Sequence, residues 1–214
     1  MELLPYRTVR KAGVSEFEIR KSRFIASVCP VADEAAAENV IQAKRKEDWK
    51  ANHHCFAYIL GKKQEVQKAS DDGEPTGTAG VPILEVLKRR KVCNVLVIVT
   101  RYFGGIKLGA GGLIRAYAHA AGIGLAAAEV VDQVPADHWQ ISVDYHLSGT
   151  FDNKLRESPY IIKNIQYMDR VFYEIYTRQE ESKFFLNWVN DLTNGRAGSE
   201  KLEELYLQQP AGEP

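Results

Sequence analysis

The sequence has few cysteines and no long hydrophobic run. Cys29, Cys55 and Cys93 are the three cysteines among 214 residues, and no two of them form a C-x-x-C pair. An odd number of widely spaced cysteines fits neither a disulfide framework nor a structural zinc site. No segment approaches the ~18 apolar residues that cross a bilayer, and the apolar run at the start of the chain is too short for a signal peptide. We therefore expect reduced, buried thiols in a cytoplasmic protein that does not bind membranes.

The chain also lacks a net charge, because 28 basic residues balance 28 acidic ones. The two signs are nevertheless unevenly divided. Residues 1–132 carry 20 Lys and Arg against 15 Asp and Glu, a balance of +5, whereas residues 133–214 carry 8 against 13, a balance of −5. A polyanion is therefore expected to bind the first half. Two solvated surfaces of unequal charge explain the same numbers equally well.

Hydrophobic patterns in the first half predict a mixture of strands and helices. The near-continuous apolar run VLVIV is typical of a central strand. An alanine-rich segment follows it, and its small residues would let a helix pack close to a sheet. The expected elements are a strand pair near 16–31, a helix from a cap at Asp33 to about Trp49, a strand at 54–60, a helix that starts near Pro82, a strand at 92–102 and a helix at 112–128.

The second half has a different order of elements. Alternating apolar residues predict a first strand, and the spacing of Leu147, Phe151 and Leu155 predicts a helix after it. Two strands around the turn at 168–170, an amphipathic helix at 184–192 and a strand at 205–208 complete the order βαββαβ, which is the ferredoxin-like arrangement. With Pro135 as the boundary, we predict an α+β protein with domains at 1–132 and 135–208 and a disordered tail at 209–214.

Glycine is concentrated in one loop between a predicted strand and a predicted helix. Five of the nine residues from Gly104 to Gly112 are glycine. Because glycine loses much conformational freedom on folding, such a cluster indicates sharp turns or a close approach to the backbone. Free N–H groups at a helix N-terminus attract anions, and Lys107 and Arg115 add positive charge nearby. A loop that only lets the helix pack on the sheet is the alternative.

The glycine loop matches neither of two known phosphate motifs. Gly104 and Gly109 have the Walker A spacing, but Ala110 and Gly111 replace its Lys and Ser/Thr, and a dinucleotide fingerprint fails at Ile114. The candidates for phosphate or RNA contacts are Arg101, Gly104, Gly105, Lys107, Gly109, Gly111, Gly112 and Arg115.

A second cluster of candidate residues precedes the helix that starts near Pro82. Asp71, Asp72 and Glu74 could hold a divalent cation or act as acid–base groups, with a histidine as the base. No established ligand spacing supports this interpretation, and Asp and Gly also favour turns. Adjacent histidines on a strand face opposite sides, so at most one of His53 and His54 would point into a shared site. The candidates of this cluster are His54, Asp71, Asp72, Glu74 and Thr76.

These motifs resemble the IMPACT family. The resemblance rests on Ser70–Pro75 (SDDGEP), Gly77–Gly80 (GTAG) and Thr100–Tyr117 (TRYFGGIKLGAGGLIRAY), and it covers residues 10–128. Residues 135–208 resemble the small C-terminal domain of bacterial members. The resemblance implies a ribosomal-protein S5 domain-2-like fold for the first domain, a ferredoxin-like fold for the second and a link to translation control. The chain starts close to the shared domain, so we do not expect the role that eukaryotic members perform with an additional N-terminal domain.

The leading hypothesis is a cytoplasmic protein without catalytic activity that binds RNA or the ribosome and regulates translation. Phosphates would contact the basic side chains of the glycine loop, and the acidic second domain would meet a protein partner. No cofactor and no metal are expected in this case. The alternative is a nucleotide- or metal-dependent small-molecule enzyme that uses Asp71, Asp72 and Glu74 in one cleft with the glycine loop. An adaptor that works through protein contacts alone is a third possibility.

Overall fold

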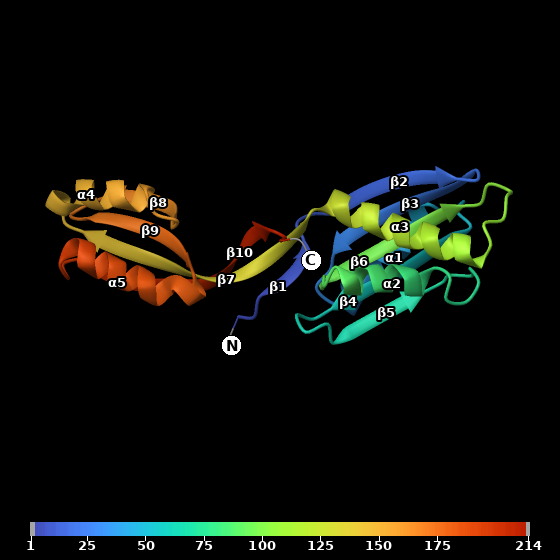
Figure 1. Ribbon diagram of the computed structural model, residues 1–214, viewed down its shortest axis with the longest axis horizontal. Helices are drawn as coiled ribbons and strands as arrows, with labels where there is room; N and C mark the ends of the chain where they lie inside the picture. The colour runs from blue at the N-terminus through green and yellow to red at the C-terminus, as the bar shows by residue number, and fades with distance from the viewer. Residues whose placement is uncertain (1–2, 213–214) are drawn as a thin grey trace. The chain divides into compact units, whose positions relative to one another are not determined.

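The computed structural model describes residues 3–212, and these residues form two compact units. The first unit contains Tyr6–Asp132 and the segment that begins at Gln208, and the second contains Gln133–Leu207 and the segment before Tyr6. Each unit combines helices with a β-sheet (Figure 1). The predicted α+β class is therefore confirmed.

The first unit is built on a five-stranded antiparallel sheet. The order of its strands is β2-β3-β6-β4-β5, so the apolar strand β6 lies at the centre as predicted. The elements are β1 (Tyr6–Val9), β2 (Gly13–Ile19), β3 (Ser22–Pro30), α1 (Glu34–Glu47), β4 (His53–Leu60), β5 (Val66–Ser70), α2 (Gly80–Arg89), β6 (Val95–Tyr102) and α3 (Ala110–Ala128). The short strand β5 pairs with β4 at the edge of the sheet.

Helices cover both faces of this sheet. Alternate residues of β6, Val95, Val97 and Val99, lie in the core shared with α2 and α3. Leu96 and Ile98 lie in the core shared with α1 on the opposite face. Because both faces are buried, every residue of the run has to be apolar, although antiparallel strands more often alternate.

Two local predictions for the helices of this unit are confirmed. The carboxylate of Asp33 accepts a hydrogen bond from the backbone N–H of Ala36 at 2.7 Å and caps α1. Helix α3 packs closely on the sheet through small residues. A Cβ atom at Gly124 would lie only 2.9 Å from the side chain of Val28 and 3.0 Å from that of Ala26.

The second unit has the element order βαββαβ that the sequence predicts. Its elements are β7 (Val130–Val143), α4 (Tyr145–Arg156), β8 (Ile161–Tyr167), β9 (Val171–Arg178), a short 3-10 helix (Gln179–Glu181), α5 (Ser182–Thr193) and β10 (Gly198–Pro210). Strand β7 pairs with β9 and β10, and β8 pairs with β9, while β1 also pairs with β7. One face of β7 and β9 forms the core with α4 and α5, around Ile141, Phe151, Tyr173, Phe185 and Val189.

The division between the two units falls within strand β7. Strand β7 runs without a break through Pro135, and the units divide between Asp132 and Gln133. Proline has no backbone N–H to give to a neighbouring strand, but the pairing of β7 with β9 starts only at Ala136. Proline at this position therefore costs β7 no hydrogen bond with β9.

The end of the chain differs in part from the prediction. Gln209 and Pro210, which were predicted to lie in a disordered tail, belong to β10. Residues 213–214 of that predicted tail lie outside the described residues. In the part of the chain that the structure describes, no helix combines the length and the apolar character needed to cross a membrane.

Candidate functional site

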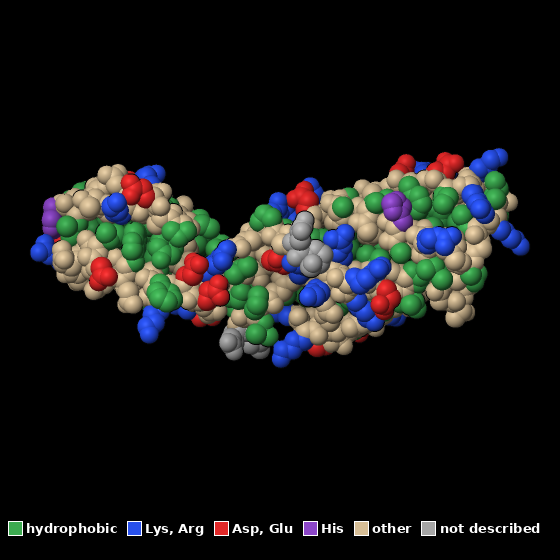
Figure 2. All heavy atoms as spheres, viewed as in Figure 1, with side chains coloured by type: hydrophobic (Ala, Val, Ile, Leu, Met, Phe, Trp, Pro, Cys, Tyr) green, Lys and Arg blue, Asp and Glu red, His purple; other side chains and the backbone are tan. Residues whose placement is uncertain are grey.

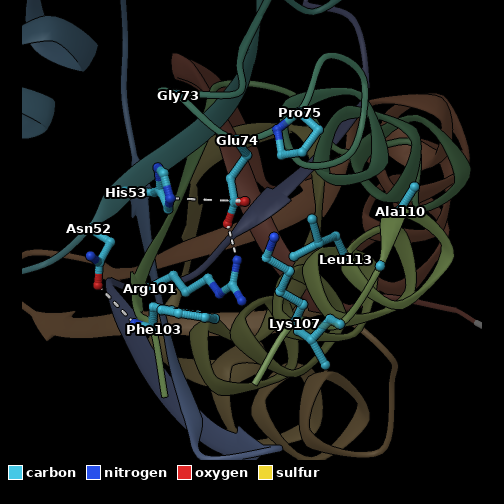
Figure 3. A pocket seen from close by; sticks show the side chains of 12 residues that line it. Asn52, His53, Gly73, Glu74, Pro75, Arg101, Phe103, Lys107, Ala110 and Leu113 are labelled. Carbon is cyan, nitrogen blue, oxygen red and sulfur yellow. Dashed lines mark hydrogen bonds and ion pairs between the residues drawn. The ribbon is translucent and has the colours of Figure 1, made fainter. Parts of the chain in front are cut away.

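The two motif clusters of the sequence meet at one pocket in the first unit. The pocket has a volume of about 430 Å³ and is shown in Figure 3. The loop before α2 and the glycine loop between β6 and α3 form opposite sides of it, and β4 and β6 contribute two strand residues. The lining residues are Asn52, His53, Gly73, Glu74, Pro75, Arg101, Phe103, Lys107, Leu108, Gly109, Ala110 and Leu113.

Strand register explains why His53 reaches this pocket and His54 does not. His53 is the cross-strand neighbour of Arg101, and His54 is the neighbour of Thr100. Because side chains alternate along a strand, His53 and Arg101 share the face on which α2 and α3 pack. His54 lies on the opposite face and does not line the pocket. Burial lowers the pKa of His54, so this histidine is neutral at physiological pH.

A buried ion pair forms the floor of the pocket. The guanidinium Nη1 of Arg101 donates to Oε1 of Glu74 at 2.6 Å, and the two residues are only 5% and 8% exposed. Tyr117 of α3 donates its hydroxyl to the same carboxylate oxygen at 2.6 Å, and Nη2 of Arg101 donates to Ser22 at 3.3 Å. Arg101, one of the predicted phosphate contacts, is thus a buried residue whose charge is partly matched by Glu74.

Two further protonated groups lie behind this ion pair. Burial raises the pKa of the Tyr117 hydroxyl, so the phenol remains a hydrogen-bond donor at all physiological pH values. Burial also raises the pKa of Cys55 to about 12, and its thiol donates to the carbonyl oxygen of Asp71 at 2.9 Å. Since the thiolate is the reactive form, Cys55 is not a nucleophile at neutral pH.

The carboxylate of Asp71 stabilises the turn before α2. It accepts hydrogen bonds from the N–H groups of Gly77, Ala79 and Gly80 at 2.8, 3.0 and 2.8 Å. Burial alone would raise the pKa of Asp71, but these three hydrogen bonds outweigh it and lower the pKa below its ordinary value. Asp71 is therefore an anion that organises its own loop.

The three acidic side chains of this cluster point to different partners. Asp72 accepts from Arg45 at 2.7 Å and from the backbone N–H of His54 at 2.6 Å, whereas Asp71 and Glu74 have the partners given above. Among the described residues, no three His, Cys, Asp or Glu side chains come together in an arrangement that could hold a metal ion. The donor set of the alternative hypothesis is therefore not assembled. Thr76 is exposed and does not line the pocket.

The glycines of the second loop have two different roles. A Cβ atom at Gly104 would lie 2.0 Å from the backbone carbon of Lys21, so Gly104 lets the turn between β2 and β3 pack on the loop. Gly105 and Gly109 have φ angles of +84° and +74°, a region that glycine adopts without strain. Gly111 and Gly112 lie in the first turn of α3, and like Arg115 they do not line the pocket.

The sequence interpretation missed several lining residues. Phe103, Leu108 and Leu113 form an apolar side of the pocket, and Phe103 is 45% exposed. The alternation of the strand that contains His53 offered one signal, because His53 has the same parity as the buried Cys55. Nothing in the spacing indicated that Tyr117, about two helical turns into α3, reaches Glu74.

Comparisons with known proteins place this site in a family. A model described as the Impact N-terminal domain matches residues 20–125, and a model described as a domain of unknown function (DUF1949) matches residues 141–196. The pocket and both motif clusters fall within the first match, and the sheet with α4 and α5 contains the second. The chain belongs to the IMPACT family, as its similarity to bacterial members over most of its length shows.

Relatives from bacteria match across both units. IMPACT family member YvyE of Bacillus subtilis is 46% identical over 204 residues, which are 95% of this chain and 94% of that protein. IMPACT family member YigZ of Escherichia coli is 36% identical over 152 residues, 67% of this chain and 74% of that protein. A solved structure titled "Crystal structure of an hypothetical protein" has a TM-score of 0.60 at 28% identity, and the match covers 94% of this chain and 99% of that chain.

Proposed function

We propose that this protein binds RNA or the ribosome in the cytoplasm and regulates translation without catalysing a reaction. Membership of the IMPACT family supports a role of this kind. The observation that carries the proposal is a set of exposed cations around the glycine loop, which we call the basic rim: Arg20, Lys21, Lys107 and Arg115.

The basic rim combines residues from two parts of the chain. Arg20 and Lys21 form the turn between β2 and β3, and Nη1 of Arg20 donates to the carbonyl oxygen of Lys107 at 3.2 Å. This contact brings the turn beside the glycine loop, and Figure 2 shows Lys and Arg side chains at this end of the unit. Within residues 3–212, none of the four rim cations takes part in an ion pair, so all are available for phosphate groups.

Ribosome co-sedimentation at several salt concentrations tests the proposal. A Lys107→Glu, Arg115→Glu double variant should lose most of its binding, because it removes two phosphate contacts and adds repulsion. Its charge change is matched by a Lys46→Glu, Lys63→Glu double variant, which alters exposed lysines away from the rim and should bind normally. Arg101 is left intact, since reversing its charge would place two carboxylates together in the interior.

The salt dependence of binding adds a second readout. Each lost phosphate contact should lower the slope of log affinity against log salt by about 1, hence by about 2 for the rim variant. Salt-independent binding, or equal binding by both double variants, would show that the basic rim is not the RNA surface. Capture of a protein alone would then favour an adaptor.

The finer fold assignments belong to the same proposal. We propose a ribosomal-protein S5 domain-2-like fold for the first unit and a ferredoxin-like fold for the second. The order of strands β8-β9-β7-β10, with α4 and α5 packed on one face, supports the second assignment. The acidic balance of residues 133–214 makes that unit the better candidate for contacts with a protein partner.

A small-molecule enzyme is the second candidate because the two motif clusters do line one pocket. Nε2 of His53 lies 3.9 Å from Oε2 of Glu74. At this separation a histidine and a carboxylate could act as general base and general acid on one bound substrate. A thermal-shift screen with nucleotides and Mg²⁺ or Mn²⁺ tests this candidate. An unchanged melting temperature at millimolar ligand would count against it.

A further inference from the structure

We infer that the pocket between the glycine loop and the Glu74–Arg101 pair binds a phosphate monoester group. The inference rests on the proposed function in one respect, because both place an anion at the glycine loop. It goes further by naming a terminal phosphate as the group that enters the pocket.

The first observation is the N-terminus of α3. This 19-residue helix starts at Ala110, its N-cap is Gly109, and no side chain caps it. The first intrahelical hydrogen bond runs from the N–H of Leu113 to the carbonyl oxygen of Gly109. The N–H groups before Leu113 have no helical acceptor, and they carry the positive end of the helix dipole. Gly109 and Ala110 line the pocket, so this end of the helix faces the cavity.

The second observation is an unused donor on Arg101. This residue is 95% buried, and its Nε–H has no hydrogen-bond partner in the described residues. Arginine has five N–H donors, and the hydrogen bonds to Glu74 and Ser22 use two of them. A buried donor without a partner costs free energy unless a ligand supplies an acceptor. Arg101 lines the same pocket as the end of α3, so one acceptor-rich group could serve both.

The charge in the pocket favours an anion. Oε1 of Glu74 accepts from both Arg101 and Tyr117, which reduces its repulsion of a second anion. Lys107 extends from the glycine loop into the pocket and points toward the Glu74–Arg101 pair (Figure 3). The charged lining residues are therefore two cations and one anion, before the helix dipole is added.

The shape of the pocket favours the end of a molecule over the middle of a strand. The Glu74–Arg101 pair closes the floor, so a ligand enters from one side. A volume of about 430 Å³ holds a phosphate group with part of the group that carries it. The exposed ring of Phe103 stands at the mouth, where a base or another flat ring could stack. A phosphate monoester has three free oxygens for the convergent donors, whereas an internal diester has two.

Binding of one short RNA in three forms tests the inference. The forms carry a 5′-phosphate, a 3′-phosphate or hydroxyl groups at both ends, and a free ribonucleoside monophosphate is the fourth probe. We expect the wild-type protein to prefer a phosphorylated form by about tenfold, the usual scale for one charge-assisted hydrogen bond. Lys107→Gln should abolish this preference, and Lys46→Gln on α1 should retain it. Fluorescence anisotropy measures the affinities.

Backbone NMR of the wild-type protein provides a measurement that needs no variant. Addition of the ribonucleoside monophosphate should move the amide signals of Gly109, Ala110, Gly111 and Gly112. If the monophosphate moves these signals and binds as tightly as RNA, the source of the phosphate is a free small molecule. A shift that requires RNA identifies the end of a strand.

Two results would overturn the inference. Equal affinity for all three RNA forms, together with unmoved amide signals, would show that the pocket takes no monoester. A phosphate preference that survives Lys107→Gln would place the site elsewhere. Ribosome binding without a monoester preference would contradict only this inference. Monoester binding without ribosome binding would contradict only the proposed function.

Discussion

The sheets of the two units differ in what covers them, and this difference decides how each holds its charges. Helices pack on both faces of the first sheet, so a charged residue of its central strand, Arg101, has to find its partner Glu74 in the interior. In the second unit, α4 and α5 cover one face. The uncovered face carries Glu174, which the exposed Lys163 contacts at 3.4 Å.

The free energy that is lost when an ion pair is broken therefore differs between the two units. Where water cannot reach a charge, loss of its partner leaves an unsolvated ion, and the cost is several kcal/mol. Where one partner stays exposed, water replaces the lost contact and the pair contributes little. The pocket is preformed because its floor is the buried Glu74–Arg101 pair, which water cannot reach.

The largest expected effect comes from breaking the buried pair. Arg101→Met leaves Glu74 buried without its cation and should lower the free energy of unfolding by about 3–5 kcal/mol. Lys163→Met removes the exposed lysine that contacts Glu174 at 3.4 Å in the second unit, and it should cause no measurable change. Urea denaturation followed by circular dichroism measures both. Equal losses in the two variants would refute the distinction between the units.

A smaller effect is expected from Asp71, and it should depend on pH. Asp71→Asn weakens the hydrogen bonds to three backbone N–H groups and should cost about 2–3 kcal/mol at neutral pH. The folded-state pKa of Asp71 is lowered, so the carboxylate contribution is complete above the ordinary value of 3.8 and is lost as pH falls through the lower folded value.

The difference in melting temperature between the wild type and Asp71→Asn should therefore narrow in strong acid. Asp191→Asn, at an exposed position near the end of α5 in the second unit, is the control and should match the wild type throughout. A difference that stays constant down to strongly acidic pH would mean that the Asp71 carboxylate is not what stabilises the turn.

The smallest expected effect should be the same in both units. Gly122 in α3 and Gly149 in α4 are helical glycines with open space where a Cβ atom would lie. Gly122→Ala and Gly149→Ala should each stabilise the protein by about 0.5–1 kcal/mol, because alanine favours the helix and restricts the unfolded chain. Thermal unfolding checks this. Gly124→Ala, which would press on Val28 and Ala26, should give no such gain.

Prediction from sequence worked best where one local pattern decides the structure. The cap at Asp33, the central strand with VLVIV and the βαββαβ order of the second half all follow from periodicity and capping, and all are observed. Pro135, which marked the expected boundary, lies inside β7, because a proline is compatible with a strand position that needs no donor.

The two motif clusters of the candidate site were recognised in the sequence, and the structure adds which side chains of each cluster line the pocket. His53 is a lining residue and His54 is not, and Arg101 lines the pocket as a buried residue. Because side chains alternate along a strand, the sequence predicts that His53 and His54 lie on opposite faces of the sheet. It does not indicate which of the two faces α2 and α3 cover. The burial of Arg101 depends on Glu74, 27 residues earlier in the chain, and no local pattern links them.

The α+β class, the order of most elements in both halves, the glycine-rich loop ahead of α3 and the family resemblance follow from the amino-acid sequence alone, because each is recorded in short-range spacing or in contiguous motifs. The tertiary structure was needed to show that the two clusters share a pocket, that Glu74 pairs with Arg101 and accepts from Tyr117, and that Arg20 and Lys21 join the basic rim. These contacts depend on strand register and on the packing of α2 and α3 against the sheet. They join residues that are far apart in the sequence, and burial then sets how strongly each charged pair interacts.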